Sequence, residues 1–93
     1  MTAVIARYTL LDGKADEFQE IVKKLIEPTR KEKGCIFYEC ARSNDDPQKF
    51  VMMENWESRE ALDEHFKAPH FVELVPKMRA LLAERTVEIF TSL

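Results

Sequence analysis

Glycine is scarce in this sequence, and long apolar runs are absent. Only two of its 93 residues are glycine, so there is no glycine-rich loop of the kind that cradles phosphate groups, and nucleotide-binding loops are excluded. No apolar run approaches the roughly 20 residues that a membrane-spanning helix needs. The amino terminus lacks the basic and long apolar regions of a signal peptide. We therefore expect a cytoplasmic protein that does not bind a membrane.

Basic charge is also in short supply. The 14 lysines and arginines are outnumbered by 17 aspartates and glutamates, which gives a net charge of −3. The basic residues are scattered among acidic ones and form no continuous stripe. Because binding to a phosphate backbone requires such a positive stripe, nucleic acid is excluded as a partner.

The sequence has only two cysteines, Cys35 and Cys40. They lie five residues apart in one predicted strand, and an odd separation places two side chains on opposite faces of a strand. Side chains on opposite faces cannot meet the geometry of a disulfide bond. We therefore expect two reduced, partly buried thiols and no disulfide or redox pair.

The spacing of apolar residues predicts strands and helices in alternation. Runs rich in β-branched, apolar and aromatic residues predict four strands, at Thr2 to Leu11, Cys35 to Arg42, Lys49 to Trp56 and Arg85 to Ser92. Apolar residues at intervals of three and four predict helices, at Ala15 to Ile26, after the N-cap Ser58, and at Phe71 to Leu82. We expect Pro28 to kink or end the first helix and Gly34 to cap it.

The predicted order, strand, helix, strand, strand, helical region, strand, is the ferredoxin-like βαββαβ pattern of an α+β fold. We expect one domain over residues 1–93 with a four-stranded antiparallel sheet. Right-handed crossovers place both helical regions on one face of that sheet. Because the strands carry apolar residues on both sides, the second face also needs a cover, and the same face of a second copy is the simplest one. The sequence therefore predicts a homodimer.

Both histidines and the single tryptophan lie within a short stretch of the chain. His65 falls on the apolar stripe of the second helical region, and His70 follows just after Pro69. Glu54 and Trp56 share one face of the third strand, where a carboxylate is costly unless it is paired or exposed. Simpler interpretations stay open: a core histidine bonded to a carbonyl, a histidine bonded to backbone at a helix start, a tryptophan that only packs, and a carboxylate in water.

No metal site is expected from Glu54, His65 and His70. The two histidines are five residues apart across a proline, whereas histidines that bind a metal from one helix are spaced i, i+4. The sequence also contains no GxSxG nucleophile motif. We therefore expect no metal and no bound cofactor.

Three motifs occur in a defined order: Gly34-Cys35-x-x-Tyr38, Glu54-x-Trp56-Glu57-Ser58 and His65-x-x-x-Pro69-His70-Phe71. Over essentially the whole chain they resemble the antibiotic biosynthesis monooxygenase (ABM) superfamily of dimeric α/β barrels. The nearest resemblance is to its bacterial quinol monooxygenase and autoinducer-2 phosphate-processing branch. The resemblance implies a homodimer whose two sheets form a barrel, with a substrate pocket in each subunit between the sheet and the helices.

The sequence departs from two other branches of that superfamily. Members that oxidise anthrones place an asparagine and a tyrosine where this chain has Met52 and Leu62. Members that degrade haem place a haem-binding histidine and an asparagine where this chain has Val75 and, approximately, Ala6. These departures argue against haem degradation and weaken the case for anthrone oxidation.

The leading functional expectation is a cofactor-independent monooxygenase that oxidises a small electron-rich aromatic, such as a quinol, with O₂. His65 or His70 would be the base, and Glu54 would orient an imidazole or the substrate hydroxyl. The expected walls of the substrate pocket are Trp56, Met52, Phe66, Phe71 and Tyr38. Two alternatives remain: an isomerase of a small hydroxyketone, phosphorylated or not, that uses the same base, and a non-catalytic dimeric barrel that binds a small ligand.

Overall fold

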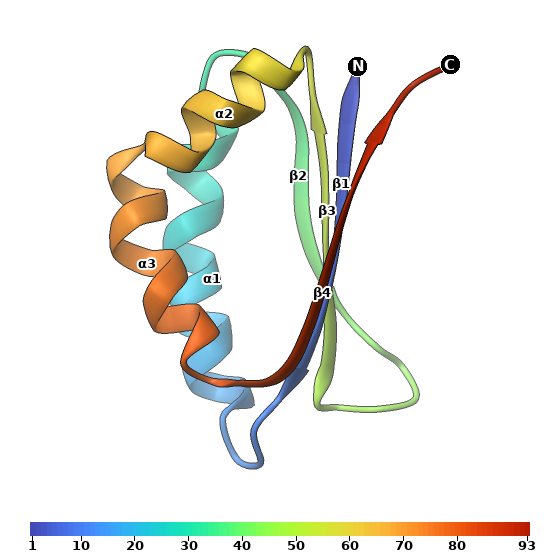
Figure 1. Cartoon of the computed structure of the whole chain (residues 1–93). Coiled ribbons are helices and arrows are strands. Elements are labelled where there is room, and N and C mark those ends of the chain that lie inside the picture. Colours follow the sequence, from blue (N-terminus) through green and yellow to red (C-terminus); the bar gives the residue numbers. More distant parts are fainter.

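The computed structural model describes residues 1–93. The protein has two layers, a four-stranded antiparallel sheet and a set of three helices that covers one face of it (Figure 1). The strands are β1 (Thr2–Leu10), β2 (Cys35–Arg42), β3 (Lys49–Trp56) and β4 (Leu82–Thr91), and the helices are α1 (Ala15–Arg30), α2 (Arg59–Lys67) and α3 (Pro69–Arg79). The sheet order is β2-β3-β1-β4. The predicted ferredoxin-like fold, with its helices on one face, is confirmed. No helix is both long and apolar enough to cross a membrane.

The core lies between the sheet and the helices. Residues at even positions of β1 are buried and face the helices, and the core also includes Phe18, Val22 and Leu25 of α1. Burying one such side chain contributes roughly 1.5–3 kcal/mol to stability. Residues at odd positions of β1, among them Ile5 and Arg7, point to the opposite face, which no element of this chain covers (Figure 1). We call this second surface the open face.

The first helix ends differently from the expectation. Helix α1 continues two residues past Pro28 to Arg30, and Lys31 is its C-cap. Gly34 therefore does not cap the helix, although its φ of 89° does need a glycine. Gly34 instead lies in the turn that leads from α1 into β2.

The boundary between the last helix and the last strand was also predicted wrongly. Helix α3 ends at Arg79, and β4 begins at Leu82 rather than Arg85. Leu81 is buried in the turn between them, where its carbonyl accepts a hydrogen bond from the Leu11 N–H. The helical spacing of Leu81 and Leu82 thus reflected their packing against the core, since burial alone produces the same apolar pattern.

The two cysteines are free thiols, as expected, but the geometric argument for them was wrong. The pairing of β2 with β3 shifts by one residue between Cys35 and Phe37, which is the mark of a β-bulge. The extra residue changes the alternation of side chains, so Cys35 and Cys40 both pack against the core. Burial raises the pKa of the Cys40 thiol to about 11, so it stays protonated at neutral pH.

Candidate functional site

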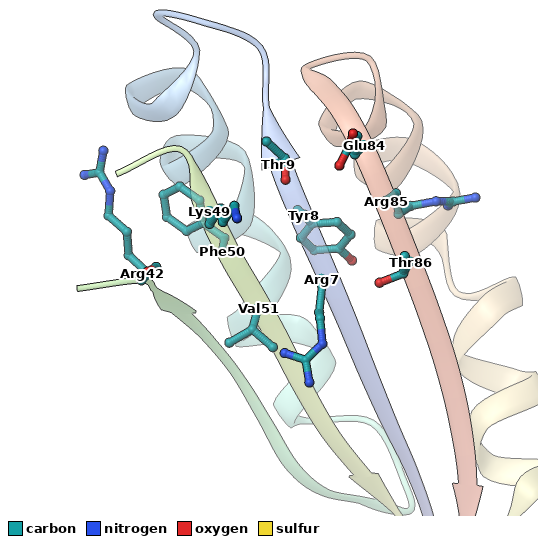
Figure 2. A pocket seen from close by; sticks show the side chains of 11 residues that line it. Arg7, Tyr8, Thr9, Arg42, Lys49, Phe50, Val51, Glu84, Arg85 and Thr86 are labelled. Carbon is teal, nitrogen blue, oxygen red and sulfur yellow. The ribbon is translucent and has the colours of Figure 1, made fainter. Parts of the chain in front are cut away.

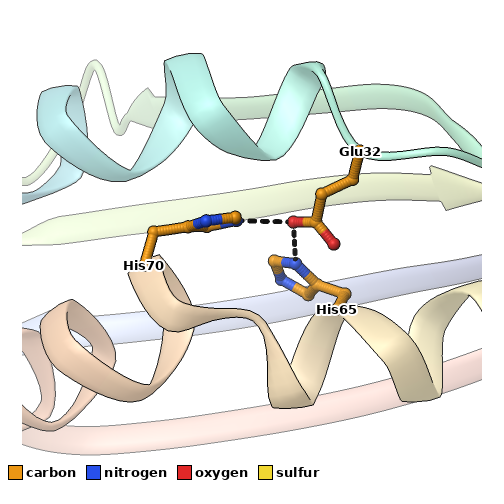
Figure 3. Close-up of side chains that lie close together, drawn as sticks. All are labelled: Glu32, His65 and His70. Carbon is orange, nitrogen blue, oxygen red and sulfur yellow. Dashed lines mark hydrogen bonds and ion pairs between the residues drawn. The ribbon is translucent and has the colours of Figure 1, made fainter.

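Both histidines converge on one carboxylate that the sequence analysis did not single out. His65 Nδ1 and His70 Nε2 each lie 2.7 Å from Glu32 Oε2 (Figure 3). A carboxylate oxygen can only accept hydrogen bonds, so both of these ring nitrogens carry the proton. In the neutral rings the lone pairs are then on His65 Nε2 and His70 Nδ1. We call these three residues the Glu32 cluster.

The break between α2 and α3 brings the two imidazoles together. Helix α2 starts at the expected N-cap, where the Ser58 hydroxyl accepts a hydrogen bond from the Ala61 N–H. Ala68 is extended, as a residue before proline prefers, and Pro69 occupies the first turn of α3. The chain changes direction there, so residues 65 and 70 face the same carboxylate although they are not spaced i, i+4. The two imidazoles therefore meet although the i, i+4 spacing, which the sequence analysis used against a metal site, is absent.

Glu32 is positioned by the turn between α1 and β2. A Cβ atom added to Gly34 would lie 2.6 Å from the Cβ of Ala61 on α2, and the Gly34 carbonyl accepts a hydrogen bond from the Glu57 N–H at 2.8 Å. The turn thus lies directly against the helix that carries His65. The one sequence signal for this approach was Gly34, and it was interpreted as a helix cap.

His65 lies in an aromatic environment and is only 1% exposed. Its ring centroid is 4.6 Å from that of Trp56, 5.0 Å from that of Phe71 and 5.6 Å from that of Tyr38. The Phe66 ring lies 5.4 Å from Phe71 and is 38% exposed. The expected aromatic residues therefore do gather around His65. Met52, the remaining expected lining residue, is buried in the core on the helix-facing side of β3.

Burial favours the neutral form of the His65 imidazole. It lowers the pKa of His65, and the hydrogen bond and charge of Glu32 oppose this shift only in part. His65 is therefore uncharged at neutral pH and keeps a lone pair on Nε2. An imidazole oriented by a carboxylate in this way is the arrangement of a general base.

Glu54 binds the indole and not an imidazole. Trp56 Nε1 donates to Glu54 Oε1 at 3.0 Å, and the carboxyl is 9% exposed. Glu54 is therefore not a carboxylate in water, and the carboxylate that contacts the two imidazoles is Glu32. Burial raises the pKa of the Glu54 carboxyl to about 7; the hydrogen bond from Trp56 opposes this shift, and the charge of Glu32 adds to it.

This pKa predicts that stability falls as the pH rises. The Glu54 carboxyl titrates near 4.5 when unperturbed, as in the unfolded chain, and near 7 in the folded protein, so the folded state binds more protons between these values. The free energy of unfolding should drop across this window by up to about 3 kcal/mol. A Glu54→Gln variant lacks this titration, and urea unfolding at pH 5, 6, 7 and 8 should show its stability rising relative to wild type.

A matched control is Glu73→Gln, which removes an exposed carboxyl from α3, away from the open face. It should keep the wild-type pH dependence, because it leaves Glu54 in place. Comparing variants at each pH cancels the titration of all other groups. A constant difference between Glu54→Gln and wild type over the whole range would contradict the assignment.

The principal cavities of the chain are not lined by His65 itself. A groove of about 470 Å³ lies at one end of the sheet and includes open-face residues such as Arg7, Lys49 and Val51 (Figure 2). An open depression of about 450 Å³ borders Glu32. None of the five principal cavities is lined by His65, His70 or Trp56. The principal cavities therefore do not include the expected substrate pocket between the sheet and the helices. The aromatic rings around His65 fill that space.

Comparisons with known proteins agree on the fold and the family. Residues 1–77 match the family described as antibiotic biosynthesis monooxygenase. The protein sll1783 of Synechocystis sp. is 41% identical over 71 residues, 76% of this chain, and the chain spans only about half (48%) of that relative. Rv0793 of Mycobacterium tuberculosis is 35% identical over 80 residues, 86% of this chain and 78% of that protein.

Solved structures extend the likeness to the whole chain. The structure of Rv0793 matches with a TM-score of 0.92 at 32% identity, covering 99% of this chain and 94% of that one. A crystal structure described as an antibiotic biosynthesis monooxygenase matches with a TM-score of 0.93 at 33% identity, covering 100% of this chain and 99% of the other. With the family match and these relatives in agreement, this chain belongs to the antibiotic biosynthesis monooxygenase family.

Proposed function

We propose that this chain is a monooxygenase of the quinol-oxidising type, in which His65 is the base that activates a small, uncharged, electron-rich aromatic for reaction with O₂. One observation carries the proposal. A neutral imidazole, buried against Trp56, Phe71 and Tyr38, is held by Glu32 through Nδ1, so that Nε2 keeps its lone pair. Aromatic walls around a single oriented base suit a phenolic substrate.

The chemistry follows from that base. His65 Nε2 removes a phenolic proton, and Glu32 stabilises the imidazolium that forms. The phenolate is a far better one-electron donor than the phenol, and therefore reacts with ground-state O₂. In the balanced reaction one oxygen atom enters a ring C–H bond and the other leaves as water. The quinol supplies all four electrons and becomes a hydroxyquinone.

The charge around Glu32 favours an uncharged substrate. The depression beside it is lined by four glutamates and a single lysine, namely Glu32, Glu57, Glu60, Glu64 and Lys33. A phosphate group would be repelled there, because phosphate recognition calls for converging arginines and lysines. This argues against the phosphorylated hydroxyketone of the isomerase alternative. Phe66 reaches the surface and contacts Phe71, which packs against His65.

An oxygen-labelling experiment tests the proposal. With a naphthoquinol or benzoquinol in excess, the chain should consume one O₂ per quinol, and ¹⁸O₂ should place one labelled atom in the product and one in water. Buffer without protein gives the rate of spontaneous oxidation. Turnover of a hydroxyketone under argon would instead support the isomerase.

A non-catalytic barrel is the second candidate, because none of the principal cavities reaches His65. In that case the Glu32 cluster is a structural network that satisfies the buried imidazole of His65 and the half-buried one of His70. The same measurement separates the candidates. A chain that binds an aromatic ligand but consumes no O₂ above the buffer rate, across a panel of quinols, would fit the barrel and contradict the monooxygenase.

We also propose that two copies pair through the open face. Its centre is apolar, since Ile5 of β1 pairs with Met53 of β3, and Phe37 and Phe90 at one end of the face are 42% and 44% exposed. Arg7 and Glu88 lie on the same face, and a two-fold contact can bring such opposite charges together. Burial of this surface against itself removes an apolar patch from water.

An Ile5→Asp variant should be monomeric. Two carboxylates at the centre of a two-fold contact would be buried without partners, which costs several kcal/mol. Light scattering during gel filtration should show a dimer for wild type and a monomer for Ile5→Asp. Val72→Asp, which changes an exposed apolar residue on α3, is the matched control and should stay dimeric. A wild-type protein that is monomeric in solution would contradict the proposed dimer.

A further inference from the structure

We propose that the Glu32 cluster is also a binding site for a divalent transition-metal ion. Its three donor atoms, one carboxylate oxygen and two imidazole nitrogens, all lie within 4.8 Å of one another. Two histidines and one carboxylate form a ligand set that Zn²⁺, Fe²⁺, Co²⁺ and Ni²⁺ accept, with further positions left for water. The same three side chains would thus serve two purposes: Glu32 orients His65 when no ion is bound, and all three residues would hold the ion when it binds.

To take an ion, the site needs its two imidazoles to move closer together. Metal–ligand bonds of about 2.0–2.2 Å place neighbouring ligand atoms about 3 Å apart. The two N···O distances are already 2.7 Å, but the donor atoms spread over as much as 4.8 Å, so the His65 and His70 nitrogens must approach each other. Glu32 stands in a turn, and its side chain is 15% exposed. Its carboxylate can therefore move outward without disturbing a helix, and the His70 side chain, which is 18% exposed, can move toward the buried His65 ring.

The surroundings favour a cation. The depression beside Glu32 also carries the carboxylates of Glu57, Glu60 and Glu64, against the single positive charge of Lys33. A concave surface of one sign raises the local concentration of the opposite ion. Apart from Glu32, the glutamates of this depression do not belong to the ligand set. They add negative charge beside the Glu32 carboxylate.

Metal binding and base catalysis exclude each other at this site. Coordination through Nδ1 of His65 moves the ring proton to Nε2, and coordination through Nε2 of His70 moves that proton to Nδ1. Each imidazole stays neutral, so no proton is released, but His65 no longer has a lone pair for a substrate proton. A bound ion would therefore inhibit the proposed oxidation. The binding itself does not rest on that function and is measured without it.

The only tryptophan of the chain provides a direct readout. The Trp56 ring lies 4.6 Å from the His65 ring, so a paramagnetic ion at the Glu32 cluster should quench its fluorescence. Untagged protein titrated with Ni²⁺ at pH 7.5 should show saturable quenching that fits one site per chain, and excess Zn²⁺ should restore the emission. Quenching that does not saturate below about 1 mM, the weak end of specific affinities, would overturn the proposal.

Two variants separate coordination from general quenching. His70→Gln places an amide nitrogen near the former Nε2, where it can still donate to Glu32, but an amide is a poor ligand for these ions. Its affinity for Ni²⁺ should fall at least about tenfold. Glu20→Gln removes an exposed glutamate of α1 that pairs only with Lys23, and it should bind as wild type does. Equal quenching in His70→Gln and wild type would also overturn the proposal.

Discussion

A His65→Asn variant is expected to lose about 100-fold to 10,000-fold in kcat/KM for quinol oxidation, the usual contribution of a positioned general base. The asparagine amide lies close to the position of the lost Nδ1 and can still donate to Glu32, so the hydrogen bond at 2.7 Å has a replacement. What disappears is Nε2 with its lone pair. Oxygen consumption at several quinol concentrations, beside circular dichroism of the folded variant, measures the loss.

His70→Gln serves as the control for this substitution. It keeps a donor for Glu32 and leaves His65 in place, so the loss in kcat/KM should stay below about tenfold, since only an indirect effect on orientation is removed. Because burial lowers the pKa of His65, the wild-type rate should also persist to pH values below the ordinary histidine pKa. A His65→Asn variant within threefold of wild type would remove His65 from the mechanism.

The fold could be predicted from the sequence because each element carries its own apolar period. Every strand and helix was expected at nearly its observed position, since period two and period 3.6 are set by local geometry. The predicted boundaries are wrong where a residue is buried but does not belong to the element that its spacing suggests. Leu81 and Leu82 have helical spacing but lie in a turn and a strand, and the bulge at the start of β2 shifts the alternation that placed Cys35.

The candidate site was predictable only in part, for a different reason. His65, Trp56 and Tyr38 stand on inward faces that the pattern of each element defines, so their association could be expected. Glu32 contacts His65 across 33 residues of sequence. A glutamate that follows a helix and lies among other charged residues is typical of a solvent-exposed position, so the sequence did not single it out. Its role depends on how closely the turn before β2 approaches α2, and no local pattern reports such a distance.

Replacing Gly34 with alanine is expected to lower the free energy of unfolding by about 2–5 kcal/mol. The backbone of Gly34 has a φ of 89°, which costs a residue with a side chain roughly 1–2 kcal/mol. The new Cβ would also lie 2.6 Å from the Cβ of Ala61, and such overpacking typically costs about 1–3 kcal/mol. Urea unfolding of the two proteins at one pH measures the difference.

Gly13 allows the two costs to be separated, because its φ is 75° and a Cβ there would have no atom within 4 Å. Gly13→Ala should therefore lose only the backbone part, about 1–2 kcal/mol, and an equal loss in both variants would contradict the close contact. Adding Ala61→Gly to Gly34→Ala should recover the contact part. Since Ala61 lies one helical turn before His65, recovery of quinol oxidation along with stability would show that this contact sets the position of Glu32 against His65.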